Sequence, residues 1–277
     1  MAGRARYLLT LSRPRFWFYL AGPVLVGVAH GAPTVDALFG PAAVALFAYF
    51  LVPANVLLYG VNDVFDRDVD AHNPKKADKE TRYRGDWLVP AAVAVAALLG
   101  VGVAAVTPRG AWPWLAAWAL LSVAYSAPPV RFKTTPLFDS ASNGLYALPG
   151  AAAYVAVAGA QPPALAVAGA WLWTMGMHTF SAIPDVEPDR AAGITTTATW
   201  LGESGAFAYV AACWLAGAGV FAALDPRAGA LLAVYPVFAV GVARSSVAVD
   251  RAYWWFPALN TAVGAALTLG GLWRFHG

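Results

Sequence analysis

Apolar runs about as long as a bilayer is thick recur along the whole chain, and they restrict its fold more than any other feature. Hydrophobic residues make up 60% of the 277 residues, and charged residues only 12%. A helix of about 20 apolar residues crosses the roughly 30 Å hydrocarbon layer. The sequence therefore predicts an all-α polytopic membrane protein with one membrane-embedded domain over residues 1–277. Its nine predicted transmembrane helices are 16–31, 37–60, 87–106, 111–127, 137–158, 164–183, 205–224, 228–246 and 253–273.

The distribution of positive charge predicts the orientation. Cytoplasmic loops of membrane proteins carry an excess of Lys and Arg. With the N-terminus inside and the C-terminus outside, only Arg109, Arg227 and Arg274 fall on the outer side. The other fifteen of the 18 Lys and Arg fall inside: Arg4, Arg6, Arg13, Arg15, Arg67, Lys75, Lys76, Lys79, Arg82, Arg84, Arg131, Lys133, Arg190, Arg244 and Arg251. We expect an N-in, C-out protein of the cell membrane.

The remaining composition narrows the class of protein. The net charge of +3 results from the charge bias of the loops, so it gives no reason to propose a nucleic acid as a partner. Cys213 is the only cysteine, which excludes an internal disulfide and any cysteine-based metal site. We expect the chain to lie in the lipid bilayer.

Two acidic clusters stand out because the rest of the chain is so apolar. The first covers residues 62–70 and follows the second predicted helix, and the second covers 185–189 and follows the sixth. Even-numbered helices of an N-in protein end at the cytoplasmic face, so both clusters are expected there. Dense carboxylates beside a membrane usually bind hard cations, and such cations usually bind phosphate.

Helical spacing refines the first cluster. At 100° per residue, Asn62, Asp63, Asp66 and Asp70 fall within an arc of about 100°, whereas Asp68 points away. One face would then present an amide and three carboxylates over about two turns. The carboxylates would repel one another strongly without a cation. Oxygen ligands of this kind suit Mg²⁺.

The second cluster has the same spacing but a less regular backbone. Asp185 and Asp189 are four residues apart, and His178 lies two turns before Asp185. Pro184 and Pro188 each remove a backbone donor, so the two aspartates could instead sit on a kinked helix end. Four other acidic residues are expected only to lie in solvated turns: Asp68, Asp78, Glu80 and Glu187.

An EF-hand is the most obvious alternative for the first cluster, because Asp66, Asp68 and Asp70 alternate. The sixth position of that loop requires Gly and the twelfth requires Glu. Here these positions hold Ala71 and Ala77, which excludes an EF-hand.

The two motifs together carry a resemblance. The pattern N-x-x-x-D-x-x-x-D at Asn62, Asp66 and Asp70, followed much later by D-x-x-x-D at Asp185 and Asp189, resembles the UbiA-type intramembrane prenyltransferases. The similarity extends over nearly the whole chain, including the segment 125–133 (YSAPPVRFK), Gly193 and the threonines 195–197.

Within that superfamily the details resemble the lycopene elongases. The segments concerned are 12–17, 73–76, 137–140 with Asn143, and 178–185. Members that act in quinone pathways commonly follow the first motif with an Arg-Pro-x-Pro-Ser-Gly-like turn. The loop 73–85 has no such turn, which argues against an aromatic acceptor.

The resemblance implies helices around a central cavity that is capped by cytoplasmic loops. It also implies Mg²⁺-dependent transfer of a prenyl group, expected to be dimethylallyl, from its diphosphate to an apolar acceptor, expected to be lycopene. The catalytic candidates are Asn62, Asp66, Asp70, Asp185, Asp189 and Tyr125. The metal-ligand candidates are Asn62, Asp63, Asp66, Asp70, Asp185 and Asp189, and the diphosphate-binding candidates are Lys75, Lys76, Arg82, Arg131 and Lys133.

Three other polar residues lie in or near predicted membrane helices: Asp139, Asn143 and His178. An ionisable group in a membrane is a functional candidate, although a hydrogen bond between helices is an equal alternative. An aromatic ring or a glyceryl phosphate is an alternative acceptor, and a transporter is a more distant alternative function. A CDP-alcohol phosphotransferase is excluded, since the Asp-Gly-x-x-Ala-Arg core is absent.

Overall fold

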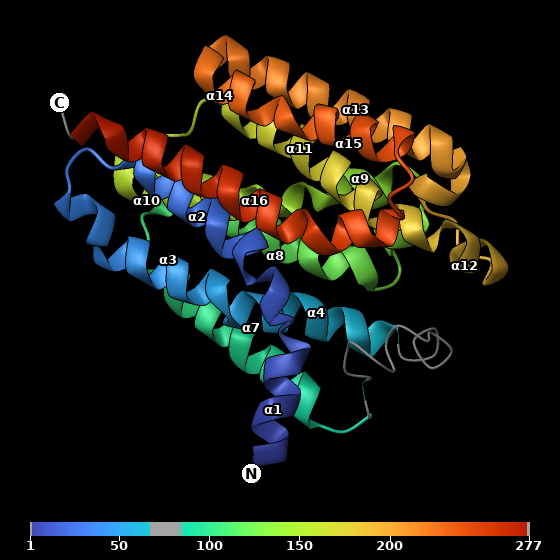
Figure 1. The fold of residues 1–277 in the computed structure, drawn as a ribbon. Coiled ribbons are helices and arrows are strands. Elements are labelled where there is room, and N and C mark those ends of the chain that lie inside the picture. The colour runs from blue at the N-terminus through green and yellow to red at the C-terminus, as the bar shows by residue number, and fades with distance from the viewer. Residues whose placement is uncertain (1, 67–82, 84, 276–277) are drawn as a thin grey trace. The chain divides into compact units, whose positions relative to one another are not determined.

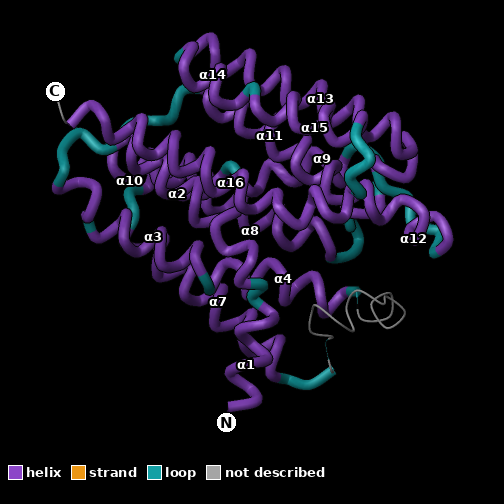
Figure 2. Tube along the Cα trace, viewed as in Figure 1, coloured by secondary structure: helices purple, strands orange, loops and turns teal. Residues whose placement is uncertain are grey.

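The computed structural model describes residues 2–66, 83 and 85–275, and the described residues contain helices and no strands (Figures 1 and 2). The chain divides into two compact units, each built from separated stretches of sequence. Unit 1 takes Met1–Val130, Leu148–Gln161 and Gly271–Gly277, and unit 2 takes Arg131–Ala147 and Pro162–Gly270. The all-α prediction is confirmed for the described residues, and the prediction of one domain stays a prediction.

Most helices of the described chain belong wholly to one unit. Unit 1 contains α1 (Ala2–Leu11), α2 (Trp17–Gly31), α3 (Pro41–Leu51), α4 (Pro53–Phe65), α7 (Leu88–Val106), α8 (Trp112–Ser126) and α10 (Leu148–Ala158). Unit 2 contains α9 (Phe138–Ala141), α11 (Ala164–Ala182), α12 (Val186–Ala191), α13 (Thr197–Leu224), α14 (Pro226–Leu232), α15 (Val234–Arg244) and most of α16 (Val249–Leu272). Short 3₁₀ helices occupy Pro14–Phe16, Asp36–Phe39, Arg109–Ala111, Phe132–Thr134, Ser142–Tyr146, Ile183–Asp185 and Trp273–Phe275.

The helices support an integral membrane protein. Among the described residues, four helical stretches are long and apolar enough to cross a membrane: Pro41–Phe65, Leu88–Val106, Thr197–Leu224 and Pro226–Arg244. The count of nine transmembrane helices and the N-in, C-out orientation stay predictions.

Proline interrupts the first of these stretches without exposing its backbone. Pro53 has no N–H to donate to the Tyr49 carbonyl one turn earlier. At the same break, the Asn55 side-chain amide donates from Nδ2 to the carbonyls of Phe50 at 3.0 Å and Leu51 at 3.1 Å. A buried asparagine thus satisfies two neighbouring carbonyls where the helix is interrupted, as hydrocarbon surroundings require.

The predicted continuous helix over 137–158 is wrong. The chain forms α9, then the 3₁₀ helix Ser142–Tyr146, then α10. Pro149 cannot donate to the carbonyl one turn earlier, and the Asp139 carbonyl accepts from two side chains, Asn143 Nδ2 at 2.6 Å and Ser142 Oγ at 3.3 Å. These side-chain bonds stabilise the irregular turn that carries Asp139.

Aromatic rings form the core of unit 2. Phe180 of α11 lies 5.7 Å from Trp214 of α13 and 5.2 Å from Phe256 of α16, between ring centroids. Trp214 also lies 5.3 Å from Tyr235 of α15, and its Nε1 donates to the Trp173 carbonyl at 3.0 Å. Tilted and edge-on rings at such distances attract one another beyond their buried area, so this cluster joins four helices.

Small residues allow α2 and α10 to pack closely in unit 1 (Figure 1). A Cβ atom added to Gly27 would lie 2.1 Å from the carbonyl oxygen of Gly150, and one added to Gly150 would lie 2.8 Å from the Pro23 carbonyl oxygen. Close backbone approach through small residues is how membrane helices gain packing energy where the hydrophobic effect gives none.

We predict that Gly27→Ala destabilises the protein, because the new methyl group meets backbone rather than a movable side chain. Overpacking of this kind costs about 1–3 kcal/mol. Gly22→Ala is the matched control on the same helix, since nothing lies within 4 Å of its added Cβ. Thermal unfolding in detergent should show a lower midpoint for Gly27→Ala alone. Equal midpoints for the two variants would contradict the close approach.

Candidate active site

The first acidic motif begins at the C-terminal end of α4. The helix ends at Phe65, and Asp66 follows as its cap with φ −103° and ψ 6°. Asn62 Nδ2 donates to Asp66 Oδ2 at 2.9 Å and to Ser126 Oγ of α8 at 2.9 Å. The amide is therefore fixed between the motif and a neighbouring helix, and it orients the buried Asp66 carboxylate.

Asp63 lies beside a cationic side chain, and its role as a metal ligand stays a prediction. Its carboxylate, 2% exposed, lies 3.4 Å from Nη2 of Arg13, whose guanidinium covers the Tyr59 ring at 4.4 Å from the centroid. The structure thus brings Asn62 and Asp66 together and gives Asp63 a cation. Within the described residues, Asp66 is the last member of the predicted helical face of the first motif. Four candidates lie outside the described residues: Asp70, Lys75, Lys76 and Arg82.

The second motif lies on a kinked helix end, one of the two predicted arrangements. After α11 the chain forms the 3₁₀ helix Ile183–Asp185 and then the short α12. Asp185 and Asp189 are partly exposed, whereas Glu187 is exposed and pairs with Arg190 at 3.1 Å.

A left-handed glycine ends α12. Gly193 has φ +70°, the Gly193 N–H donates to the Arg190 carbonyl at 3.0 Å, and the Ile194 N–H donates to the Asp189 carbonyl at 2.8 Å. Glycine adopts this conformation without the steric cost of a side chain. The glycine after the motif thus sets where the chain leaves the acidic turn.

Arg131 and Lys133 lie at the start of unit 2, and both are partly buried. Arg131 has φ 44°, and its carbonyl accepts from both the Thr134 N–H at 3.2 Å and Thr134 Oγ1 at 3.1 Å. Arg13 has a similar backbone, with φ 50° before the 3₁₀ helix Pro14–Phe16. Left-handed backbone costs a residue other than glycine roughly 1–2 kcal/mol, and such strain gathers at functional sites.

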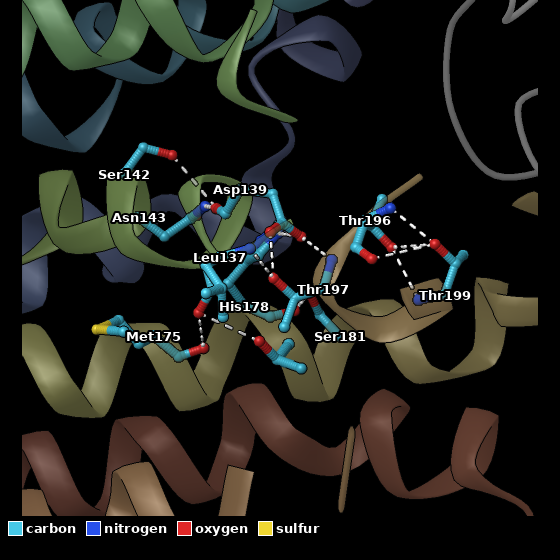
Figure 3. A network of polar contacts seen from close by, with 12 residues as sticks. Leu137, Asp139, Ser142, Asn143, Met175, His178, Ser181, Thr196, Thr197 and Thr199 are labelled. Carbon is cyan, nitrogen blue, oxygen red and sulfur yellow. Dashed lines mark hydrogen bonds and ion pairs between the residues drawn. The ribbon is translucent and has the colours of Figure 1, made fainter. Parts of the chain in front are cut away.

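A network of buried polar groups surrounds Asp139 (Figure 3). Its Oδ2 accepts from the Thr197 N–H at 2.9 Å, and its Oδ1 accepts from Thr197 Oγ1 in a short hydrogen bond. The carboxylate lies against the first turn of α13, where the helix dipole stabilises negative charge. His178 Nε2 of α11 lies 3.6 Å from Oδ2. Asp139 and His178 are separate functional candidates in the sequence, and no motif or spacing pairs them.

The donor set of the motifs fits a hard cation. Each motif by itself offers oxygen ligands, from Asn62 and Asp66 in the first and from Asp185 and Asp189 in the second. In the described part of the chain, no three His, Cys, Asp or Glu side chains lie close enough together to hold a metal ion. Mg²⁺ needs few protein ligands, because it keeps waters and takes oxygens from phosphate. The residues therefore fit Mg²⁺ better than Zn²⁺, which prefers His and Cys.

We predict that Ser126→Ala weakens binding of metal and diphosphate several-fold. Ser126 Oγ accepts one of the two hydrogen bonds that fix the Asn62 amide, and one such bond contributes about 0.5–1.5 kcal/mol. Ser122→Ala is the matched control, since Ser122 is equally buried on α8 and its hydroxyl has no hydrogen-bond partner among the described residues. Titration with a prenyl diphosphate in the presence of Mg²⁺ measures both affinities. Unchanged affinity in Ser126→Ala would show that Asn62 needs no second anchor.

Comparison with known proteins agrees with the motifs. Residues 17–273 match the family model described as the UbiA prenyltransferase family. Two similar relatives are both named lycopene elongase/hydratase. The one from Haloferax volcanii is 66% identical and covers 99% of this chain and 91% of its own length. The one from Halobacterium salinarum is 65% identical and covers 97% of this chain and 98% of its own.

The fold is also that of solved relatives. A UbiA homologue from Archaeoglobus fulgidus, bound to DMAPP and Mg²⁺, matches with a TM-score of 0.73 at 20% identity, over 96% of this chain and 99% of that one. The family match and the close relatives make the chain a prenyltransferase rather than a transporter. This chain belongs to the UbiA prenyltransferase family.

Proposed function

We propose that this protein transfers a dimethylallyl group from its diphosphate to a linear carotenoid such as lycopene, in a Mg²⁺-dependent step of C50 carotenoid synthesis. The observation that carries the proposal is the 66% identity, over 99% of the chain, with a protein named lycopene elongase/hydratase. The oxygen-only donor sets of the two motifs support the diphosphate half of the reaction.

The residues of the two motifs bind and orient the donor in this proposal. Asn62 holds the Asp66 carboxylate in one direction, and Asp185 and Asp189 are the proposed ligands of the second motif. Mg²⁺ held by these residues would neutralise the charge that develops on the leaving diphosphate. Arg131 and Lys133 add positive charge for the phosphate oxygens, as do Lys75, Lys76 and Arg82 outside the described residues. Asp70 completes the first motif and is a further proposed ligand.

The allyl cation that remains must be kept from water and stabilised. The faces of aromatic rings attract cations. Two other aromatic residues near the first motif are less suited to this role. Arg13 already covers the Tyr59 ring at 4.4 Å from its centroid, and the Phe65 side chain is 44% exposed. We therefore propose Tyr125, which is partly buried on α8 next to Ser126, for the catalytic role.

The acceptor is proposed to be apolar. The interiors of the four candidate membrane helices in the described chain contain no Lys or Arg that could bind a carboxylated acceptor. A terminal alkene of lycopene attacks the allyl cation, and the tertiary cation on the carotenoid is resolved by proton loss or by water. The active site is proposed to face the cytoplasm, where the predicted nine-helix, N-in, C-out topology would put both motifs.

An acceptor panel tests the proposal. Purified protein is incubated with dimethylallyl diphosphate, Mg²⁺ and either lycopene, an aromatic acid or a glyceryl phosphate, and the products are weighed by mass spectrometry. We expect products heavier than lycopene by one or two five-carbon units. Prenylation of the aromatic acid or the glyceryl phosphate without any lycopene product would refute the carotenoid acceptor and leave only the family.

Removing a motif carboxylate should abolish transfer in a protein that still folds. We predict a loss of at least about 100-fold for Asp66→Ala, Asp70→Ala and Asp185→Ala, since changes merely behind the ligands already cost 10- to 100-fold. Glu187→Ala is the control, because its exposed side chain lies within the second motif yet pairs with Arg190. Near-normal turnover by any of the three aspartate variants would exclude its proposed role.

Transfer should also depend on a divalent cation with a preference for oxygen ligands. We predict loss of activity after chelation and recovery on addition of Mg²⁺ or Mn²⁺, since both suit carboxylates. Product formation is followed before and after the cation is returned. Full activity in exhaustively chelated protein would contradict the mechanism.

A further inference from the structure

Diphosphate binding leaves the Asp139–His178 pair unexplained. The Asp139 side chain is 1% exposed, and His178 Nε2 lies 3.6 Å from its Oδ2. Ionisable groups inside a membrane protein are expensive to bury, and they mark sites of proton or ion chemistry. A carboxylate beside an imidazole is the arrangement in which the carboxylate stabilises an imidazolium.

The carboxylate of this pair is held in one orientation. Thr197 bonds to both of its oxygens, through the backbone N–H to Oδ2 and through the hydroxyl to Oδ1. The Thr197 hydroxyl accepts from the Leu137 N–H at 2.7 Å, so its own proton points at Asp139. With the α13 N-terminus beside it, Asp139 is stabilised as an anion and does not need a proton from His178.

His178 is the more exposed member of the pair. Its side chain is 15% exposed, against 1% for Asp139. The Nε2–Oδ2 separation is longer than a hydrogen bond, and catalytic contacts of this kind often shorten only when the reacting molecule is bound.

The position along α11 matches the part of the reaction that needs a base. His178 lies on α11, and Asp185 ends the 3₁₀ helix that follows α11, seven residues later. Asp185 belongs to the diphosphate end of the donor in the proposed function. Groups that meet the hydrocarbon of donor and acceptor therefore belong further into the helix, where His178 lies.

We propose that His178 is the proton acceptor in the step that neutralises the carotenoid cation, and that Asp139 is its positioning residue. This inference rests on the proposed function. After the new C–C bond forms, the acceptor carries a tertiary cation. In one route the imidazole takes a proton from the neighbouring carbon, and the C–H electron pair becomes a C=C bond. In the other, a water oxygen bonds to the cation and its proton passes to the imidazole, which gives a tertiary alcohol.

The competing role is structural, because the Asp139–Thr197 bonds alone would hold α9 against α13. The two roles differ in what His178 is needed for. A structural pair would lower stability or donor affinity when broken, whereas a proton acceptor changes the yield of carotenoid product for each diphosphate released.

The test uses purified full-length protein with dimethylallyl diphosphate, Mg²⁺ and lycopene in ¹⁸O-labelled water. His178→Gln, His178→Ala, Asp139→Asn and the control Ser181→Ala are compared with the unchanged chain. Ser181 lies on the same helix and bonds only to the His178 backbone carbonyl, at 2.6 Å among the contacts described. Diphosphate release, donor affinity and the mass of the carotenoid product are measured, with and without added imidazole.

We expect both His178 variants to form roughly 100-fold less elongated carotenoid per diphosphate released, the lower range of general-base effects. Added imidazole should restore product in His178→Ala but not in Asp139→Asn. Unchanged donor affinity in the His178 variants would show that the loss of product is not due to misfolding. Ser181→Ala should form as much product per diphosphate released as the unchanged chain. An ¹⁸O label in the product shows that the imidazole took its proton from water. An unlabelled alkene shows that it took the proton from the neighbouring carbon.

Two results would overturn the inference. One is an unchanged ratio of product to released diphosphate in His178→Gln, and the other is loss of donor affinity in step with loss of product, without rescue by imidazole. The unchanged chain tests the proposed function separately. If it releases diphosphate and prenylates another acceptor but never lycopene, the proposed function fails and this inference falls with it.

Discussion

Charge compensation within the protein is the constraint on which the rest of this structure depends. A buried carboxylate in an apolar protein must be paired or hydrogen-bonded, since its desolvation otherwise costs several kcal/mol. The buried aspartates of the described chain each meet this requirement differently. Asp63 pairs with Arg13, Asp66 accepts from the Asn62 amide, and Asp139 accepts twice from Thr197.

These differences in partner suggest a division of roles. Asp63 pairs with a guanidinium. Asp66 accepts from a neutral amide, and we propose it as a metal ligand. Asp139 accepts from the first residue of α13, and we propose that it positions His178. In these proposals, carboxylates of one type serve metal binding and proton transfer according to what surrounds them.

Local spacing predicted the parts of the site that depend on neighbours in the chain. The four-residue interval brings Asn62 against Asp66, and the prolines 184 and 188 indicated the kinked end that carries Asp185. The apolar runs predicted the all-α class, which is confirmed for the described residues. Position within the chain also indicated that Glu187 would be exposed.

Long-range packing decided what the sequence could not. Arg13 meets Asp63 across 50 residues, and Thr197 meets Asp139 across 58. Neither pair follows from a repeat or an interval, since each requires two helices to pack in one register. The break in 137–158 was missed because Asn143 and Ser142 capture the Asp139 carbonyl, an interaction that hydropathy does not register.

In the proposed function, both acidic motifs bind one donor molecule. Calorimetric titration with an unreactive thiolo analogue of dimethylallyl diphosphate tests it most directly, in Mg²⁺, for the unchanged chain, Asp66→Asn and Asp185→Asn. The account predicts one analogue bound per chain and a large loss of affinity in each single variant. Unchanged affinity in either variant, or two independent analogues per chain, would contradict a shared donor site.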